Sequence, residues 1–206
     1  MVEYRLHGFS VSGNSYKVAL MLAACKADWE AVPVRRTDLR DPKWRASVNP
    51  TGEAPVLEHK GRFLAQSAII LDYLAETLGK HGWRNEDERR EIQSWLFFDN
   101  HKFTGPLAFA RFRRLILKID DAATADYQER FDLSLGIIEQ RLGQHQWIAL
   151  DRLTIADFSY AGYLFYDPSE LALDWSKTPN LKAWRDRIAA LPGWKGPHDL
   201  LPPIVT

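Results

Sequence analysis

Residues 49–57 read NPTGEAPVL, and this stretch decides the fold of the first part of the chain. Two prolines and a glycine come directly before the apolar pair Val56-Leu57, so the pattern predicts a loop that ends where a strand begins. Pro55 has no amide hydrogen to donate, which suits the first residue of a strand. A cis bond after Ala54 would turn the backbone groups of Val56 outward, towards an extended peptide ligand. An ordinary loop with a trans proline is the alternative.

Strand and helix patterns alternate around this loop, from the N-terminus to about residue 78. Short apolar runs predict strands, and apolar residues at helical spacing predict helices. A Lys-Gly pair between the last two apolar runs is typical of a tight antiparallel hairpin. The order is therefore β-α-β-α-β-β-α. The expected strands are 4–9, 29–34, 55–59 and 62–64, and the expected helices are 14–26, 41–47 and 66–78.

The second half of the chain carries only helical patterns. Residues 79–85, GKHGWRN, have two glycines and no periodicity, which predicts a linker. The chain then divides into an α/β domain over residues 1–78 and an all-helical domain over residues 86–206. The expected helices cover 86–118 with a break near Gly105-Pro106, then 125–143, and two more begin at Thr154 and at Pro179.

Composition excludes several classes of partner. Lys plus Arg and Asp plus Glu number 27 each, so no net charge favours nucleic acid or an anionic membrane surface. No apolar run reaches the length of about 18 residues that a membrane span needs. Cys25 is the only cysteine, which excludes an internal disulfide and an all-cysteine metal site and suits a reducing compartment. We expect a cytoplasmic protein without a metal.

Residues 10–18, SVSGNSYKV, place three serines where the first strand passes into the first helix. Ser, Asn and Gly are ordinary residues of a turn and a helix start, which is one interpretation. The other is that a hydroxyl there has a chemical role. At the next helix start, Gln66-Ser67, unpaired amides and the positive end of the helix dipole would accept a carboxylate. Ser67 could donate its hydroxyl as well, or serve only as a helix cap.

These motifs, in this order and spacing, resemble those of the cytosolic glutathione S-transferases. Within LTIADFSY, the residues TIAD match an internal capping box of that family, in which Thr154 and Asp157 close a buried helix start. The resemblance covers nearly the whole chain. It implies a thioredoxin-like N-terminal domain, an all-helical C-terminal domain and glutathione as co-substrate. The matching stretches are SVSGNSYKV, NPTGEAPVL, QSAII, LTIADFSY and TPNLKAWRDRIAALPGW.

The resemblance also implies how glutathione is held. Val56, which follows Pro55, would pair its backbone with the cysteinyl part of the tripeptide, while Gln66 and Ser67 would hold the γ-glutamyl end. Many relatives carry a lysine at the position of Glu53, which here would repel the glycyl carboxylate if it pointed there. Either Glu53 turns to solvent, or glutathione binds weakly, or another cation takes the part. The candidate cations are Arg40, Lys43 and Arg45.

In serine-type members of the family, a hydroxyl just before the first helix donates a hydrogen bond to the glutathione sulfur. The motif S-x-x-[CS]-x-[KR] gives this role to Ser12, with Ser15 one helical turn onward, and Ser10 is the competing candidate. Oxidoreductases and transferases that use a cysteine need it in this loop, which has none. Cys25 lies on the apolar stripe of the following helix, where a buried structural thiol is expected.

The electrophile would bind where the loop after the first strand meets the first helix of the second half. An aromatic stripe at helical spacing can also belong to a core, so both interpretations stay open. Nearby arginines could recruit an acidic substrate or form a solvated basic face. The candidate substrate residues are Phe9, Trp95, Asp99 and Phe103, and the arginines are Arg111, Arg113 and Arg114.

The sequence thus predicts an enzyme that conjugates the thiolate of glutathione to a small hydrophobic electrophile, as in detoxification. An isomerase, a peroxidase or a dehalogenase of the same fold is an alternative. A non-catalytic interaction module that binds glutathione weakly is another, and Glu53 and Gln66 favour it. The family further implies a homodimer.

Overall fold

The structure is a computed structural model that describes residues 2–205, and it divides into two compact units. One unit holds the described residues up to Gly82 together with those from Leu191 onward, and the other runs from Trp83 to Ala190. The first boundary falls within the predicted linker, 79–85. The return of the last residues to the first unit differs from the prediction, which assigned them all to the helical domain.

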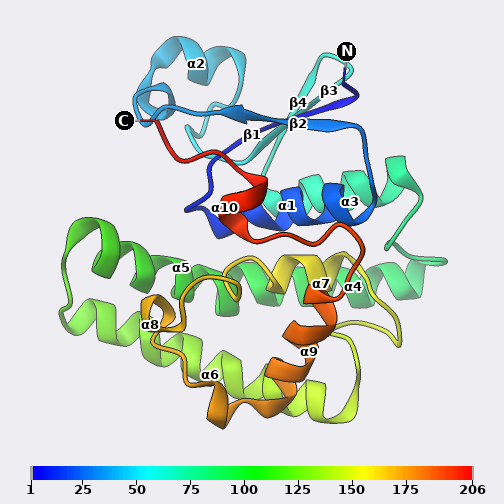
Figure 1. The fold of residues 1–206 in the computed structure, drawn as a ribbon, viewed down its shortest axis with the longest axis vertical. Helices are drawn as coiled ribbons and strands as arrows, with labels where there is room; N and C mark the ends of the chain where they lie inside the picture. Colours follow the sequence, from blue (N-terminus) through cyan, green and yellow to red (C-terminus); the bar gives the residue numbers. More distant parts are fainter. Residues whose placement is uncertain (1, 206) are drawn as a thin grey trace. The chain divides into compact units, whose positions relative to one another are not determined.

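The first unit is built on a four-stranded mixed sheet (Figure 1). β1 lies between β2, which runs parallel to it, and β3, which runs antiparallel, and β4 pairs with β3 at the edge. All four strands and the hairpin are those predicted, within two residues at each end, and the sheet and its helices form the thioredoxin-like arrangement. The bounds are β1 Tyr4–Gly8, β2 Trp29–Pro33, β3 Val56–His59 and β4 Arg62–Ala65.

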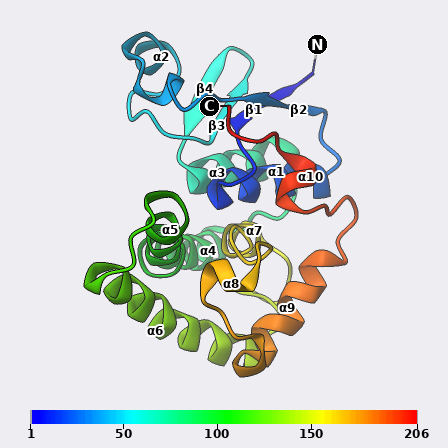
Figure 2. The same cartoon turned by 60° about the vertical axis from the view of Figure 1, so that its left-hand side comes forward.

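Helices α1 (Gly13–Ala24) and α3 (Ser67–Leu78) lie on one side of this sheet and pack against each other. The short helix α10 (Pro197–Leu200), drawn in red, packs on α1 (Figure 2). α2 (Pro42–Ser47) lies on the other side and begins as predicted, with Asp41 as N-cap and proline in its first turn. The apolar stripe of α1 is fully buried, so this helix forms the centre of the unit's core.

The second unit is helical, as predicted, but its long first helix is broken earlier than expected. α4 (Glu86–Phe98) passes into a π-helical segment, Asp99–Phe103, before α5 (Thr104–Phe112) continues. Pro106 has no amide hydrogen for the carbonyl four residues before it, so the regular ladder is lost in the turn ahead of the proline. The remaining segments are π-helical Arg113–Leu117, α6 Ala122–Gln144, α7 Ile155–Tyr160, α8 Pro168–Leu171, 3₁₀-helical Trp175–Lys177 and α9 Pro179–Ala189.

The start of α7 confirms the predicted capping box. Thr154 is the N-cap, and its backbone amide donates to the Asp157 carboxylate at 2.9 Å. The same carboxylate also accepts from the amide of Ile148 and from the indole of Trp184, each at 2.9 Å. Asp157 is fully buried, and this burial raises its pKa to about 6 although the N–H donors pull it down. The box therefore ties a loop and α9 to the core helix α7.

Candidate functional site

Ser12 lies at the N-cap of α1, where β1 gives way to the helix. Its side chain accepts a hydrogen bond from the amide of Ser15 at 3.2 Å, while its own amide donates to the carbonyl of Phe9 at 3.1 Å. A hydroxyl has one proton to donate and two lone pairs. Because the capping bond uses a lone pair, it leaves the proton of Ser12 for an acceptor beyond the helix end.

The other two serines of the turn are more deeply enclosed. Exposed fractions are 9% for Ser12, 2% for Ser10 and 0% for Ser15. Ser10 donates its amide to the carbonyl of Pro202 at 2.8 Å. Ser15 packs on Gly8 so closely that a Cβ at position 8 would lie 2.8 Å from its hydroxyl oxygen, and that oxygen has no hydrogen-bond partner among the described residues. Of the three, Ser12 is the most accessible.

The start of α3 lies beside the start of α1. The hydroxyl of Ser67 donates to the side-chain oxygen of Asn14 at 3.4 Å, which joins the first turns of the two helices. Gln66, just before α3, has φ +69°, a left-handed conformation that is uncommon for a residue with a side chain. Two helix N-termini with their unpaired amides therefore meet at one place, a favourable environment for anionic groups. Asn14 was not singled out from the sequence, where only its position in the first helical turn could have indicated it.

The loop before β3 is organised by the buried side chain of Asn49. This amide donates to the carbonyl of Glu53 at 2.9 Å, and its oxygen accepts from the amide and the hydroxyl of Thr51. The carboxylate of Glu53 in turn accepts from the side-chain nitrogen of Gln66 at 3.1 Å. Glu53 is thus paired with Gln66 across the site rather than only turned to solvent.

Among the alternative cations, Arg45 is held in place by the chain around it. Its guanidinium donates to the carbonyl of Leu39 at 2.9 Å and lies over Gly52, where a Cβ would come within 2.4 Å of it. Gly52 also has φ +68°, so glycine is required there on both counts. Arg40 and Lys43 are exposed. Of the three, Arg45 is therefore the one seen against the loop that carries Glu53.

The bond between Ala54 and Pro55 is cis, the first of the two alternatives that the sequence left open. Val56 follows as the first residue of β3, opposite His7 of β1 and Ala65 of β4. The side chains of Pro55 and Val56 are buried. Any contact of Val56 with a ligand would therefore involve its backbone.

Of the predicted substrate residues, Asp99 and Phe103 belong to the interior of the helical unit. Asp99 is fully buried and accepts hydrogen bonds from the hydroxyls of Thr104, at 2.6 Å, and Ser159. Phe103 lies between the rings of Phe131 and Tyr160, with centroids about 5 Å away. This packing favours the core interpretation for both. Phe9 and Trp95 are half-buried, the latter with Arg141 over its ring.

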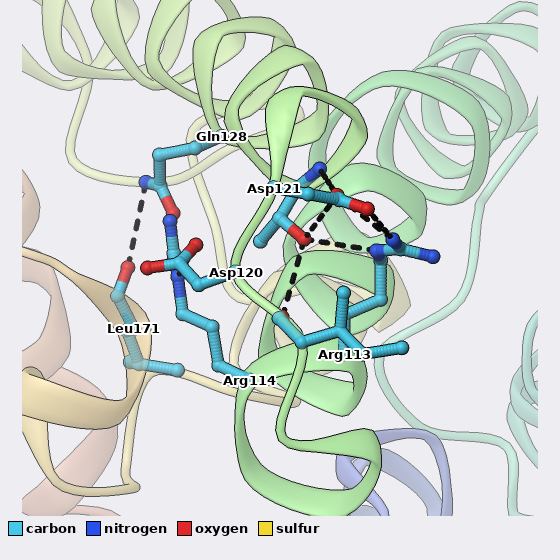
Figure 3. A network of polar contacts seen from close by, with 8 residues as sticks. Arg113, Arg114, Asp120, Asp121, Gln128 and Leu171 are labelled. Carbon is cyan, nitrogen blue, oxygen red and sulfur yellow. Dashed lines mark hydrogen bonds and ion pairs between the residues drawn. The ribbon is translucent and has the colours of Figure 1, made fainter.

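The three arginines are engaged within the helical unit, and Figure 3 shows Arg113 and Arg114 with their partners. Arg113 binds both oxygens of Asp121 and the hydroxyl of Thr124, while Arg114 binds Asp120 and Gln128. The Thr124 amide and the Arg113 guanidinium hold the pKa of Asp121 below its usual range. Arg111, similarly, donates to Glu170 of α8 and lies over the ring of Tyr166. The contacts of Arg113 and Arg114 close the turn that precedes α6, and the pairing of all three arginines argues against an arginine surface that recruits acidic substrates.

Comparison with known families decides what this chain is. Residues 11–77 match the glutathione S-transferase N-terminal domain, and residues 107–192 match the glutathione S-transferase C-terminal domain. The chain belongs to the glutathione S-transferase family. It is accordingly a glutathione S-transferase, and glutathione is its co-substrate.

Individual relatives cover nearly the whole transferase. A crystal structure of a possible glutathione S-transferase from Rhodopseudomonas palustris superposes with a TM-score of 0.87 at 33% identity, covering 98% of this chain and 92% of the other. A glutathione S-transferase of Hyoscyamus muticus is 29% identical over 205 residues, covering 92% of this chain and 95% of its own. FtsZ-localized protein A of Caulobacter vibrioides is 27% identical over 206 residues, covering 93% and 89%.

Proposed function

We propose that this transferase binds glutathione as a thiolate: the thiol proton leaves to solvent, and the hydroxyl of Ser12 stabilises the sulfur anion by a hydrogen bond. The thiolate then attacks a small hydrophobic electrophile and forms a carbon–sulfur bond, either as a leaving group departs with its electron pair or, in an addition, as the adduct takes up a proton. The observation that carries the proposal is the hydroxyl of Ser12, which caps α1 through a lone pair and keeps its proton for an acceptor. It is also more exposed than Ser10 or Ser15.

The free energies of a hydrogen bond and a helix dipole are sufficient to ionise the bound thiol near neutral pH. A thiol of pKa ~8.5 is only about 3% ionised at pH 7, and lowering the pKa by ~2 needs about 2.7 kcal/mol. A hydrogen bond to a charged acceptor supplies roughly 1.5 to 3 kcal/mol, and the end of a helix dipole adds about 0.3 to 1 kcal/mol. One hydroxyl and the N-terminus of α1 together can therefore make the bound sulfur mostly thiolate near neutral pH.

The rest of the tripeptide would be held by groups around the same helix starts. The backbone of Val56 would pair with the cysteinyl part, while Gln66 and Ser67 would bind the γ-glutamyl end. The side-chain amide of Gln66 donates to Glu53, so if Gln66 binds the γ-glutamyl end as proposed, the carboxylate of Glu53 would stand beside the ammonium group. In this way Glu53 would assist binding rather than weaken it.

The proposal is tested by titrating the ultraviolet absorbance of the bound thiolate against pH in the parent, in Ser12→Ala and in Ser10→Ala. We expect the apparent pKa of bound glutathione to rise by at least about 1 in Ser12→Ala, because a charge-assisted hydrogen bond is lost. Ser15→Ala is the matched control, since that hydroxyl has no partner among the described residues. A rise in Ser10→Ala in place of Ser12→Ala would move the role to Ser10, and no rise in either would reject it.

A non-catalytic interaction module is the second candidate. The relation to FtsZ-localized protein A, whose name describes a location rather than a reaction, favours it. Retention on immobilised glutathione, followed by turnover of a generic aromatic electrophile, separates the two candidates. Retention without turnover of any electrophile, peroxide or organic halide would favour the module, whereas turnover of peroxide or halide alone would indicate a peroxidase or a dehalogenase.

We also propose that the transferase is a cytoplasmic homodimer. Each unit exposes large apolar side chains, among them Phe63 and Ile69 in the first and Phe97 and Leu133 in the second, which could serve an interface. No helix within residues 2–205 combines the length and apolar character needed to cross a bilayer. Sedimentation of the purified chain tests the dimer.

A further inference from the structure

The last part of the chain returns to the unit that carries Ser12. Residues 191–205, which we call the C-terminal strap, leave α9 and run along α1 to the end of β2, as the red segment of Figure 1 shows. The strap contains α10 and is otherwise irregular. Its contacts fall on three parts of the first unit: the body of α1, the serine turn between β1 and α1, and the chain after β2.

The strap is first fixed on α1. Gly193 has φ +77° and approaches the helix so closely that a Cβ there would lie 2.5 Å from the carbonyl oxygen of Ala23. Next to it, the hydroxyl of Tyr16 donates to the carbonyl of Lys195 at 2.9 Å, and the side chain of Pro197 is buried. Only glycine fits at position 193, because both the conformation and the close approach exclude a side chain.

The strap then reaches the serine turn. Leu201 is buried beside Gly8, at the end of β1. The carbonyl of the next residue, Pro202, accepts the amide of Ser10 at 2.8 Å. Ser10 lies outside β1 and α1, so this bond gives a buried turn amide a partner that neither element supplies.

Beyond the turn, the strap joins the end of β2. The amide of Val205 donates to the carbonyl of Val34 at 3.4 Å, and the amide of Arg36 donates to the carbonyl of Val205 at 3.1 Å. These bonds form a short parallel bridge between Arg35 and Val205. The serine turn is thus held from outside by a segment that is itself fixed on both sides of it.

We infer that the C-terminal strap is a positioning element of the thiol site: by holding Ser10 it fixes the turn in which Ser12 aims its hydroxyl. The strap meets the turn through the carbonyl of Pro202, which binds Ser10 and not Ser12, so its effect on the thiol would pass through the turn. A small displacement of a hydrogen-bond donor weakens the bond steeply, because the bond depends on distance and angle. This inference rests on the proposed role of Ser12.

Gly193→Ala tests the inference because it disturbs the strap at the C-terminal end of α1, whereas Ser12 lies at the N-terminal end of that helix. The matched control is Gly61→Ala: Gly61 has φ +75° in the hairpin turn, and a Cβ there would have nothing within 4 Å, so this variant carries the conformational cost without the clash. In Gly193→Ala we expect the apparent pKa of bound glutathione to rise by about 1, a tenfold fall in the ratio of thiolate to thiol at a given pH. Hydrogen exchange at the Ser10 amide should accelerate, and Gly61→Ala should change neither.

Leu201→Ala provides a second route if Gly193→Ala does not fold, since it loosens the strap beside the turn without a backbone clash. We expect the same rise in pKa, and no further rise when either strap variant is combined with Ser12→Ala. A lower melting temperature with faster Ser10 exchange but an unchanged pKa would overturn the inference and leave the proposed function intact. An unchanged pKa in Ser12→Ala itself would instead reject the proposed function.

Discussion

Two helix starts, one in each unit, are capped in opposite ways. At α7, Thr154 and Asp157 close a box in which the buried carboxylate accepts several N–H groups. At α1, Ser12 makes a single capping bond of 3.2 Å from the amide of Ser15. The first arrangement uses the acceptor capacity of its carboxylate within the fold, whereas in the second the hydroxyl of Ser12 accepts one capping bond and, on our proposal, donates its proton to a ligand. The difference indicates that a saturated cap serves the fold and an unsaturated one can serve chemistry.

Removing the carboxylate of the capping box at α7 should have the largest effect on stability. Asp157→Ala leaves the amides of Ile148 and Thr154 and the indole of Trp184 buried without their acceptor. Each buried unsatisfied donor costs about 1 to 3 kcal/mol, so we expect a loss of about 4 kcal/mol or more in the free energy of unfolding. Chemical denaturation measures this loss. Asp126→Ala, on the exposed face of α6, is the control and should leave the stability unchanged. If Asp157→Ala also left the stability unchanged, the carboxylate would not be satisfying these donors.

The same carboxylate should make stability depend on pH. Burial raises the pKa of Asp157 from 3.8 to about 6 in the folded chain. The folded state therefore binds this proton more tightly than the unfolded state, so the associated stabilisation is present below about pH 4 and is lost as the pH rises through 6. A shift of about 2 corresponds to roughly 3 kcal/mol.

Asp157→Asn removes the titration while keeping the size of the side chain. We expect its stability relative to the parent to improve steadily between pH 4 and pH 7 in urea unfolding. A relative stability that worsens over this range would mean that the N–H donors outweigh burial, with the pKa of Asp157 below that of the unfolded chain.

Breaking the unsaturated cap should affect activity more than stability. For Ser12→Ala we expect kcat/KM to fall about 10- to 100-fold, because a hydrogen bond to the developing thiolate is worth roughly 1.5 to 3 kcal/mol. Loss of an N-cap costs about 1 kcal/mol of folding free energy. Steady-state kinetics and urea unfolding of one preparation measure the two losses. A stability loss with unchanged kinetics would place Ser12 with Thr154, as a purely structural cap.

The contrast also explains which features could be predicted from sequence. The cis bond before Pro55, the hairpin and the capping box at Thr154 depend on residues within a few positions of one another, and local motifs indicated them. Asp99 was a candidate for a pocket face with Trp95 and Phe103, because their spacing fits a regular helix, and a core face was the alternative. The π-helical segment shifts that register, and Ser159, which donates to Asp99, is about 60 residues further along the chain. Neither feature could be predicted from the local sequence.

The contacts of the C-terminal strap could not be predicted from the sequence for a related reason. Its bonds from Ser10 to Pro202 and from Arg36 to Val205 join main-chain groups, which leave no mark in the choice of side chains. At Gly193 the contact does restrict the residue, but a glycine between two helical patterns is typical of any turn. Long-range main-chain contacts therefore need the structure, even where the family is evident from sequence.

The smallest effect on stability is expected for Ser15→Ala, which changes the same turn without removing the cap of α1. Its hydroxyl is buried against Gly8 without a hydrogen-bond partner among the described residues, while its amide supplies the capping bond to Ser12. Ser15→Ala keeps that amide and removes a desolvated hydroxyl, so we expect the free energy of unfolding to stay within about 0.5 kcal/mol of the parent or to rise slightly. Urea unfolding and the thiol titration measure the outcome. A loss of more than about 1 kcal/mol would show that the hydroxyl makes a hydrogen bond in the folded protein.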